Sequence, residues 1–289
     1  MKSVCFSFAD LTGLITQEKM VKLTPNFRPF LKKHKKPDYT LEYLAIPELD
    51  DLQGELLYSG IEYDVLQKQN DEIIRIFKDP VKNNFIYAYS KMMPFEENVK
   101  IYFLKGNEQY FDNLNNSFFH SGWEQILLWK KRMILHAALI DTEYGGILFS
   151  GRSGVGKSTQ ADLWIEIENA ELINGDRPIL YRSADEWLGS GSPYAGSSEC
   201  YVNASVPVRA LFFLEQGEQT SLQRLNFTET VKKVYENCTV YAWNKEFVDR
   251  IFSLIIELAK GIPAYRLVNK ADHESVEIVK QELQKEVIK

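Results

Sequence analysis

Residues 1–118 alternate between apolar and polar side chains with the period of two that is typical of β-strands. The alternation is clearest at Val4/Phe6/Phe8, Leu41/Tyr43/Ala45 and Ile101/Phe103. Aromatic and β-branched runs at 73–77 and 85–89 are separated by the turn residues Pro80 and Asn83. Because no helical pattern stands between these runs, they predict an antiparallel sheet rather than βαβ units.

The pattern changes near Ser121, where spacings of three and four residues replace the alternation. Ser121 and Glu124 have the S-x-x-E spacing of a capping box, which predicts the start of a helix. The apolar run Met133–Ile140 is typical of one buried strand, and Ile147–Phe149 predicts another. Apolar residues at helical spacing then predict a helix over Lys157–Glu168.

The last part of the chain continues this alternation of strands and helices. Strands are expected at 172–173 and 208–214. An apolar stripe over 247–258 predicts a helix that ends at Gly261. A second stripe over 276–283 predicts a final helix, for which Asp272 is the expected N-cap.

The length of the chain, 289 residues, suggests two domains at about 150 residues each. The change of pattern divides it into a β-rich N-terminal region, residues 1–118, and an α/β domain, residues 119–289. With 45% hydrophobic and 26% charged residues, the chain has the composition of an ordinary globular protein that buries a sizeable core.

The charge balance excludes several classes of function. Lys and Arg number 34 against 40 Asp and Glu, which gives a net charge of −6 and no basic field for nucleic acid or an anionic membrane. No apolar run approaches the ~18 residues of a membrane helix, and Asp10 interrupts any signal-like core. Three widely spaced cysteines without a CxxC pair argue against a disulfide framework or a zinc knuckle. We therefore expect a cytoplasmic protein.

The segment GRSGVGKS, from Gly151 to Ser158, matches the P-loop pattern G-x-x-x-x-G-K-[ST]. Its glycines let successive N–H groups turn inward around a phosphate, and the helix that follows presents its positive end. In this pattern Lys157 reaches the β- and γ-phosphates and the Ser158 hydroxyl binds Mg²⁺. A strand before the loop and a helix after it are the context that the motif requires. The expected nucleotide-binding residues are Gly151, Arg152, Ser153, Gly154, Val155, Gly156, Lys157, Ser158 and Thr159.

A P-loop alone does not define a reaction, and Asp176 is the first acidic residue to consider beside it. Asp176 follows one predicted helix and one short strand, a path that returns the chain to the side of the P-loop. There its carboxylate would bind Mg²⁺ or accept a proton from an attacking hydroxyl. The surrounding run N-G-D-R-P is also strong turn chemistry, so a purely local role in a turn stays open.

The run from His136 to Trp164, HAALIDTEYGGILFSGRSGVGKSTQADLW, is followed by LINGDRPIL. Together these segments resemble the HPr kinase/phosphorylase family, whose P-loop kinase core is similar to that of ATP-dependent phosphoenolpyruvate carboxykinase. The resemblance covers residues 120–285. It implies an α/β fold with a P-loop-containing, mixed-sheet kinase core of this type, preceded by the β-rich N-terminal region.

The resemblance also implies roles for individual residues. His136 has the placement of the family histidine and would lie near the γ-phosphate, although a histidine in an apolar strand is otherwise a core residue. Asp176 and Arg177 match the end of the family's acidic motif, and Glu199 stands near its magnesium-binding glutamate. The expected catalytic residues are Asp176, His136 and Lys157, and the expected metal ligands are Ser158, Asp176 and Glu199.

Two features depart from the family pattern. Gly175 occupies the place of the first of two adjacent acids, so that one carboxylate would serve both metal and proton, or another acid would help. The segment with which the family grips HPr and supports the phosphorylase reaction has no counterpart in this chain. HPr as the substrate and the phosphorylase reaction are therefore not carried over.

Residues and resemblance together predict an ATP-dependent, Mg²⁺-dependent phosphotransferase that moves the γ-phosphoryl group to a hydroxyl. The expected acceptor is a Ser or Thr of a small protein or peptide, with a small molecule as another option, and the N-terminal region would recognise the substrate or a partner. The missing acid at Gly175 motivates a different hypothesis, a non-catalytic nucleotide-binding regulatory module. A carboxykinase and an adaptor with a vestigial P-loop are two further candidate functions. The choice between ATP and GTP, and association into a homo-oligomer, are left open.

Overall fold

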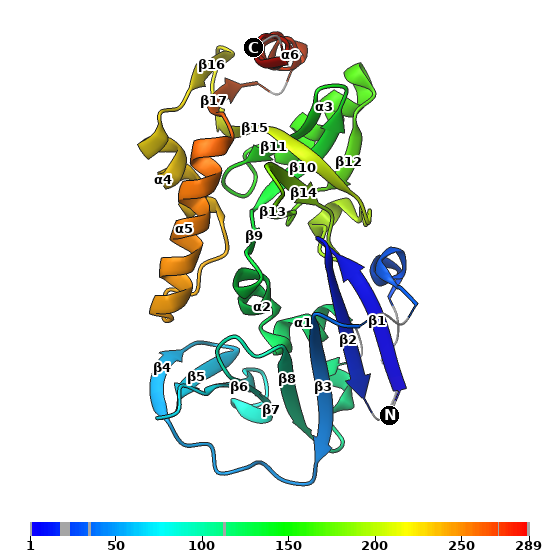
Figure 1. Cartoon of the computed structure of the whole chain (residues 1–289), viewed down its shortest axis with the longest axis vertical. Helices are drawn as coiled ribbons and strands as arrows, with labels where there is room; N and C mark the ends of the chain where they lie inside the picture. Colours follow the sequence, from blue (N-terminus) through cyan, green and yellow to red (C-terminus); the bar gives the residue numbers. More distant parts are fainter. Residues whose placement is uncertain (1, 18–23, 34–35, 112–113, 271, 288–289) are drawn as a thin grey trace. The chain divides into compact units, whose positions relative to one another are not determined.

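The computed structural model describes residues 2–17, 24–33, 36–111, 114–270 and 272–287. The chain divides into two compact units, which we describe separately (Figure 1). Unit 1 contains the residues up to Trp129 together with Ala242–Lys245, and unit 2 contains Lys130–Tyr241 and Glu246–Lys289. The division follows Trp129, whereas residue 118 lies inside helix α1 (Leu114–Ser121).

Unit 1 is built on an eight-stranded sheet with the strand order β1-β2-β3-β8-β7-β6-β5-β4. The pairs β2/β3 and β3/β8 are parallel, and the other neighbours are antiparallel. The strands are β1 (Lys2–Phe8), β2 (Leu11–Gln17), β3 (Tyr39–Ile46), β4 (Glu55–Ser59), β5 (Tyr63–Gln67), β6 (Ile73–Asp79), β7 (Phe85–Met92) and β8 (Asn98–Leu104).

The strands expected in this region are confirmed, but the expectation of an antiparallel sheet is wrong, because the sheet is mixed. Strand β3 pairs on one side with β2 and on the other with β8, which is distant in sequence. Parallel neighbours need a long connection, and here the meander from β4 to β7 is part of it. An alternating pattern identifies strands but carries no information about such crossovers.

Aromatic side chains fill much of the core of unit 1. The ring of Phe6 packs against those of Phe27, Tyr39 and Phe118, and all four side chains are buried.

Ser121 lies in the last turn of α1, where its hydroxyl donates to the carbonyl of Phe118. The predicted capping box is therefore wrong in its placement, because Ser121 ends one helix instead of beginning the next. The remaining helical elements of this unit are η1 (Pro25–Phe30), η2 (Glu108–Phe111) and α2 (Trp123–Trp129).

Unit 2 contains a nine-stranded mixed sheet, seven strands of which follow the order β12-β10-β11-β15-β14-β13-β9. Strand β11 pairs antiparallel with β10 and parallel with β15, and β15 pairs parallel with β17. The strands are β9 (Arg132–Ile134), β10 (Ala137–Thr142), β11 (Gly145–Ser150), β12 (Glu171–Asn174), β13 (Ile179–Ser183), β14 (Glu186–Ser190), β15 (Ser205–Gln216), β16 (Ser221–Arg224) and β17 (Ala264–Asn269). The protein is thus a mixed α/β structure.

The single strand predicted over Met133–Ile140 is wrong, because the structure breaks it at Leu135 and His136. Strand β9 pairs with β13, whereas β10 pairs with β11 and β12. The chain exchanges one set of partners for another at the break. His136 therefore stands between two strands rather than inside one.

Helices α3, α5 and α6 agree with their predicted positions, whereas α4 was not predicted. Helix α3 (Lys157–Glu168) packs on β10 and β11 with Trp164 fully buried, whereas Ile165 is 36% exposed. Asp272 caps the last helix, since its carboxylate accepts from the backbone N–H of Ser275 at 3.2 Å. The helices are α3 (Lys157–Glu168), α4 (Phe227–Asn237), α5 (Lys245–Gly261) and α6 (His273–Val287). Within the described ranges, no helix is long and apolar enough to span a bilayer.

Candidate functional site

The predicted P-loop connects the end of β11 to the first residue of α3. Gly151, Gly154 and Gly156 have φ values of 145°, 77° and 109°, a range that residues with a side chain rarely adopt. A Cβ at Gly154 or Gly156 would meet no atom within 4 Å, so the backbone conformation, and not lack of space, requires glycine there. Gly156 is also the N-cap of α3 and offers no side-chain cap, which leaves the first N–H groups of the helix available to an anion.

Lys157 is the first residue of α3, and its side chain lies back over the loop. The residue is only 8% exposed, and its Nζ donates to the carbonyls of Gly151 at 3.2 Å and Arg152 at 3.3 Å. Burial lowers the pKa of Lys157, and the negative charge of Asp176 opposes that shift. A partly buried ammonium held by carbonyl oxygens of the loop is a cation prepared for an anionic ligand.

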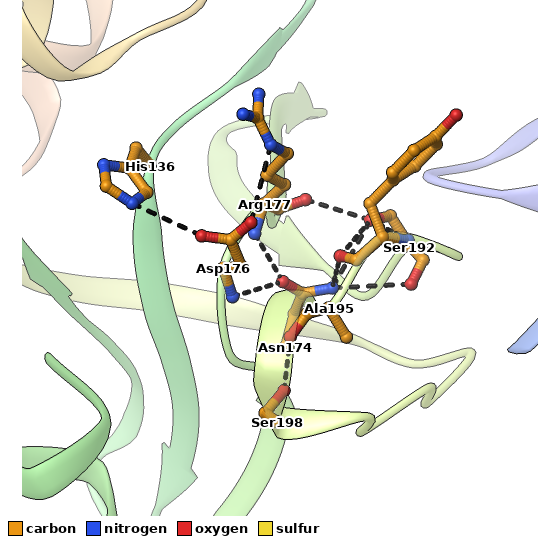
Figure 2. A network of polar contacts seen from close by, with 8 residues as sticks. His136, Asn174, Asp176, Arg177, Ser192, Ala195 and Ser198 are labelled. Atoms are coloured by element: carbon orange, nitrogen blue, oxygen red, sulfur yellow. Dashed lines mark hydrogen bonds and ion pairs between the residues drawn. The ribbon is translucent and has the colours of Figure 1, made fainter. Parts of the chain in front are cut away.

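The carboxylate of Asp176 lies between an imidazole and a guanidinium (Figure 2). Its Oδ1 is 3.3 Å from Nε2 of His136, and its Oδ2 is 3.5 Å from Nε of Arg177. Burial lowers the pKa of His136, with a further lowering from Lys157 and Arg177, while Asp176 acts in the opposite direction. The lowered pKa favours a neutral imidazole beside the carboxylate.

The turn that carries Asp176 is shaped by the buried side chain of Asn174, at the end of β12. Its Oδ1 accepts from the backbone N–H groups of Asp176 at 3.0 Å and Arg177 at 2.7 Å. Its Nδ2 donates to the carbonyl of Tyr194 at 2.8 Å, and the Ser192 hydroxyl donates to the carbonyl of Arg177 at 3.0 Å (Figure 2). Sequence reasoning missed Asn174. The signal was present, because asparagine two residues before an aspartate is Asx-turn chemistry.

The backbone of His136 is fixed on both sides, which explains its position at the break between β9 and β10. Its N–H donates to the carbonyl of Asn237 at 2.8 Å, and its carbonyl accepts from the hydroxyl of Ser150 at 2.9 Å. The next residue, Ala137, donates its N–H to the carbonyl of Asp176 at 3.0 Å. Two adjacent residues, His136 and Ala137, thus make the hydrogen bonds that fix the backbone of the histidine and that of Asp176.

Gly175, the residue before Asp176, has no room for a side chain. A Cβ at this position would lie 2.3 Å from Oγ and 2.6 Å from Cβ of Ser198. Gly196, which has a φ of 55°, lies as closely against Asp176, since a Cβ there would be 2.9 Å from that residue's Cβ. The loop from Gly191 to Glu199 thus packs directly against Gly175 and Asp176.

These segments surround a cavity of about 280 Å³. It brings together four of the predicted catalytic and metal-binding residues, His136, Lys157, Ser158 and Asp176. Ser158 is exposed at its wall. Glu199, by contrast, is exposed to solvent and is not part of the lining. Within the described part of the chain, no three His, Cys, Asp or Glu residues are grouped so that they could hold a metal ion by themselves.

No protein-family model matches the chain, and a search of curated proteins gave no match. Among solved structures, the chain is similar to the Hpr(Ser) kinase/phosphatase from Coxiella burnetii, with 13% sequence identity and a TM-score of 0.34. The alignment covers 53% of this chain and 91% of the other. At this TM-score the likeness carries no weight for the function, which has to be inferred from the site's own residues.

Proposed function

We propose that the protein is an ATP-dependent phosphotransferase of HPr-kinase-like type, which moves the γ-phosphoryl group to a hydroxyl. One observation carries the proposal: the loop and helix end that would bind phosphates share a cavity with the Asp176 carboxylate and the His136 imidazole. Phosphoryl transfer asks a protein mainly for positioning and electrostatic stabilisation, and this cavity offers groups for both tasks.

Each group has a distinct task in the proposed reaction. The backbone N–H groups of residues 152–158 hold the β-phosphate, and Lys157 balances the charge on the β- and γ-oxygens. Asp176 orients the acceptor hydroxyl and takes its proton as the new O–P bond forms and the bond to ADP breaks. His136 lies against the carboxylate and helps to direct it into the cavity, and Arg177 balances charge beside it.

The donors in the cavity suit Mg²⁺, which prefers oxygen ligands and takes few of them from the protein. Ser158 contributes a hydroxyl and Asp176 a carboxylate, and phosphate oxygens with water would complete the shell. The ion supplies neutralisation of the phosphate charge when it is bound. Glu199 as a third ligand stays a prediction, because its side chain stands outside the cavity lining.

The acceptor we propose is a Ser or Thr hydroxyl of a small protein or peptide in the cytoplasm, recognised by the β-rich region. The side chain of Asp176 is 28% exposed, so that an incoming hydroxyl can reach it without displacing the backbone. A second candidate function is nucleotide binding without catalysis. The close packing of Gly175 against Ser198 favours it, because the site then holds one carboxylate where the family motif has two.

The two candidates are separated by following the γ-phosphate. The purified protein is incubated with γ-labelled ATP, Mg²⁺ and an extract of its source cells, beside an Asp176→Asn control. Label that appears on a protein, peptide or metabolite with the wild type, but not with the Asp176→Asn control, supports the transferase. Measurable nucleotide affinity without any labelled product would support the binding module instead.

A further inference from the structure

Strand β4 is one of the two outer strands of the sheet in unit 1 (Figure 1), and within the described ranges it pairs only with β5. The opposite outer strand, β1, is covered by the chain itself. There the carbonyl of Cys5 accepts from the N–H of Lys32 at 2.9 Å. An uncovered outer strand presents backbone N–H and C=O groups with which another strand can pair. Strand β4 is thus a place where a further strand can be added.

Apolar side chains on both faces of the sheet continue to this edge. Leu56 stands opposite Leu66, which stands opposite Ile74, and Leu66 and Ile74 pack in one apolar cluster. Tyr58 stands opposite Val65, which is fully buried and, as the neighbour of Leu66, points to the other face. At the edge itself, Leu56 is 60% exposed and Tyr58 is 38% exposed. An added strand would cover both side chains.

The segment that contains β4 is acidic. Between Lys36 and Lys68 the sequence has eight acidic residues and no Lys or Arg. Glu48, Glu55 and Glu62 are exposed and, within the described part of the chain, they form no ion pair. The carboxylates before β4, at its first residue and in the turn after it are therefore available to positive charges on a ligand.

The charge selects among the possible occupants of this edge. Exposed carboxylates attract Lys and Arg side chains. A second copy of β4 would instead bring like charges together, which is unfavourable between neighbouring strands. The nearest cations do not offset this, because Lys78 is 2.7 Å from Asp64 and Lys91 is 2.7 Å from Asp50. The edge therefore suits a basic segment with apolar residues better than it suits itself.

We propose that β4 binds the peptide acceptor as an added strand, and that the bound segment carries Lys or Arg beside apolar side chains. In such complexes the backbone hydrogen bonds supply affinity, and the side chains on alternate positions supply specificity. The inference rests on the proposed function, in which unit 1 recognises the acceptor. It concerns a surface of unit 1, whereas the proposed site of transfer belongs to unit 2.

The test begins with peptides selected from a random display library on the wild-type protein, without nucleotide. We expect the selected peptides to combine Lys or Arg with apolar residues, and their binding, measured by fluorescence anisotropy, to weaken as salt is added. Leu56→Lys places a positive charge at the edge and should weaken binding at least about tenfold. Val81→Lys is the matched control, because Val81 is also exposed but lies between β6 and β7, and it should change nothing.

Modified peptides test whether the ligand binds as a strand. Alternate residues of a strand direct their N–H groups to opposite sides. N-methylation of one alternate set of residues should therefore abolish binding, and N-methylation of the other set should leave it intact. With γ-labelled ATP and the cell extract, Leu56→Lys should also label the acceptor at least about tenfold more slowly than Val81→Lys.

The inference is overturned if the selected peptides lack Lys and Arg, if none of them depends on Leu56, or if the two N-methylated sets bind alike. A dimer of the protein that Leu56→Lys dissociates would also overturn it, because a second copy would then occupy the edge. Label transfer that Leu56→Lys leaves unchanged removes this inference and keeps the transferase. Peptide binding at β4 by a protein that transfers no label supports the added strand and removes the transferase.

Discussion

Lys157 and Asp176 bring opposite charges to the same cavity, and each changes the proton affinity of its neighbours. Burial favours the neutral form of Lys157, and the Asp176 carboxylate favours the charged form. His136 is subject to the same two residues with opposite signs. Removing the charge of Lys157 or of Asp176 should therefore shift the pKa of His136.

The role of Asp176 is tested by Asp176→Asn, which keeps the shape of the side chain and removes its ability to accept a proton. We expect the rate of transfer to fall by about 10²–10⁴, the usual contribution of general-base catalysis, while ATP still binds. The measurement is the turnover rate with labelled ATP together with the dissociation constant of the nucleotide. An Asp176→Asn variant with wild-type turnover would remove Asp176 from the mechanism.

The protonation of His136 follows from its surroundings. Because its pKa is lowered from the ordinary value of about 6.5, the folded protein binds this proton less readily than the unfolded chain does. Acidification below about pH 6.5 should therefore reduce the free energy of unfolding, and His136→Asn should weaken that dependence.

NMR titration of the imidazole checks the sign of each contribution to the pKa of His136. The pKa should fall further in Asp176→Asn and rise in Lys157→Met. A titration midpoint above 6.5 in the wild type, or no change in either variant, would contradict this account of the site.

Part of the site was predictable from the sequence at this scale, and part was not. The spacing of the P-loop pattern selected Lys157 and Ser158, and Asp176 was selected as the first acidic residue beside it; the structure brings the three to one cavity. Beyond its own turn, Asn174 donates its Nδ2 to the carbonyl of Tyr194, and the carbonyl of Asn237 accepts from the N–H of His136. Such contacts depend on how the chain folds back on itself, and a single sequence does not record them.

At the scale of elements, the break between β9 and β10 determines the position of His136. Hydrophobicity predicted one strand there, because all residues from Met133 to Ile140 except the histidine are apolar. The break arises from a change of pairing partners, with β13 on one side and β11 and β12 on the other. The predicted helix over Lys157–Glu168 was confirmed to the residue, since its start and its buried face are both encoded locally.

The loop that covers Gly175 offers a test of packing between elements. Gly175→Ala should lower the free energy of unfolding by about 1–3 kcal/mol, because the new Cβ would overlap the side chain of Ser198. The backbone of Gly175 is not in the left-handed region, so strain there adds nothing. In a Ser198→Gly background the same substitution should cost much less.

Urea denaturation of the two single variants and the double variant measures this coupling between Gly175 and Ser198. Purely additive effects would show that the two positions do not touch in solution. Strong coupling would show that Ser198 is what excludes a side chain at position 175.

At the scale of the whole molecule, the chain consists of two units, and the candidate site belongs to unit 2. Length and the change of pattern predicted two regions, and the resemblance implied a mixed sheet in the second, but the mixed topology of the sheet in unit 1 was not predicted. Strands such as β3 and β8 become neighbours through long connections, and local sequence patterns do not predict which strands such connections bring together. The recognition of a substrate or partner by unit 1 stays a prediction.

Hydrogen exchange measures where a nucleotide acts on the whole chain. With Mg²⁺–ATP at about a hundred times its dissociation constant, binding should add about 2.7 kcal/mol to the stability of the folded form. Slower exchange is expected at residues 151–159 and 174–177, where the ligand would contact the backbone. Protection confined to strands β4 to β7 of unit 1 would contradict the assignment of the site.

Calorimetric titration of the wild type and of Lys157→Ala with Mg²⁺–ATP tests the phosphate-binding role of the loop most directly. The account predicts a clear heat of binding for the wild type and an affinity at least about tenfold lower for the variant, a loss of about 1.4 kcal/mol. A wild-type protein that gives no heat with millimolar nucleotide, or a Lys157→Ala variant that binds as tightly as the wild type, would contradict it.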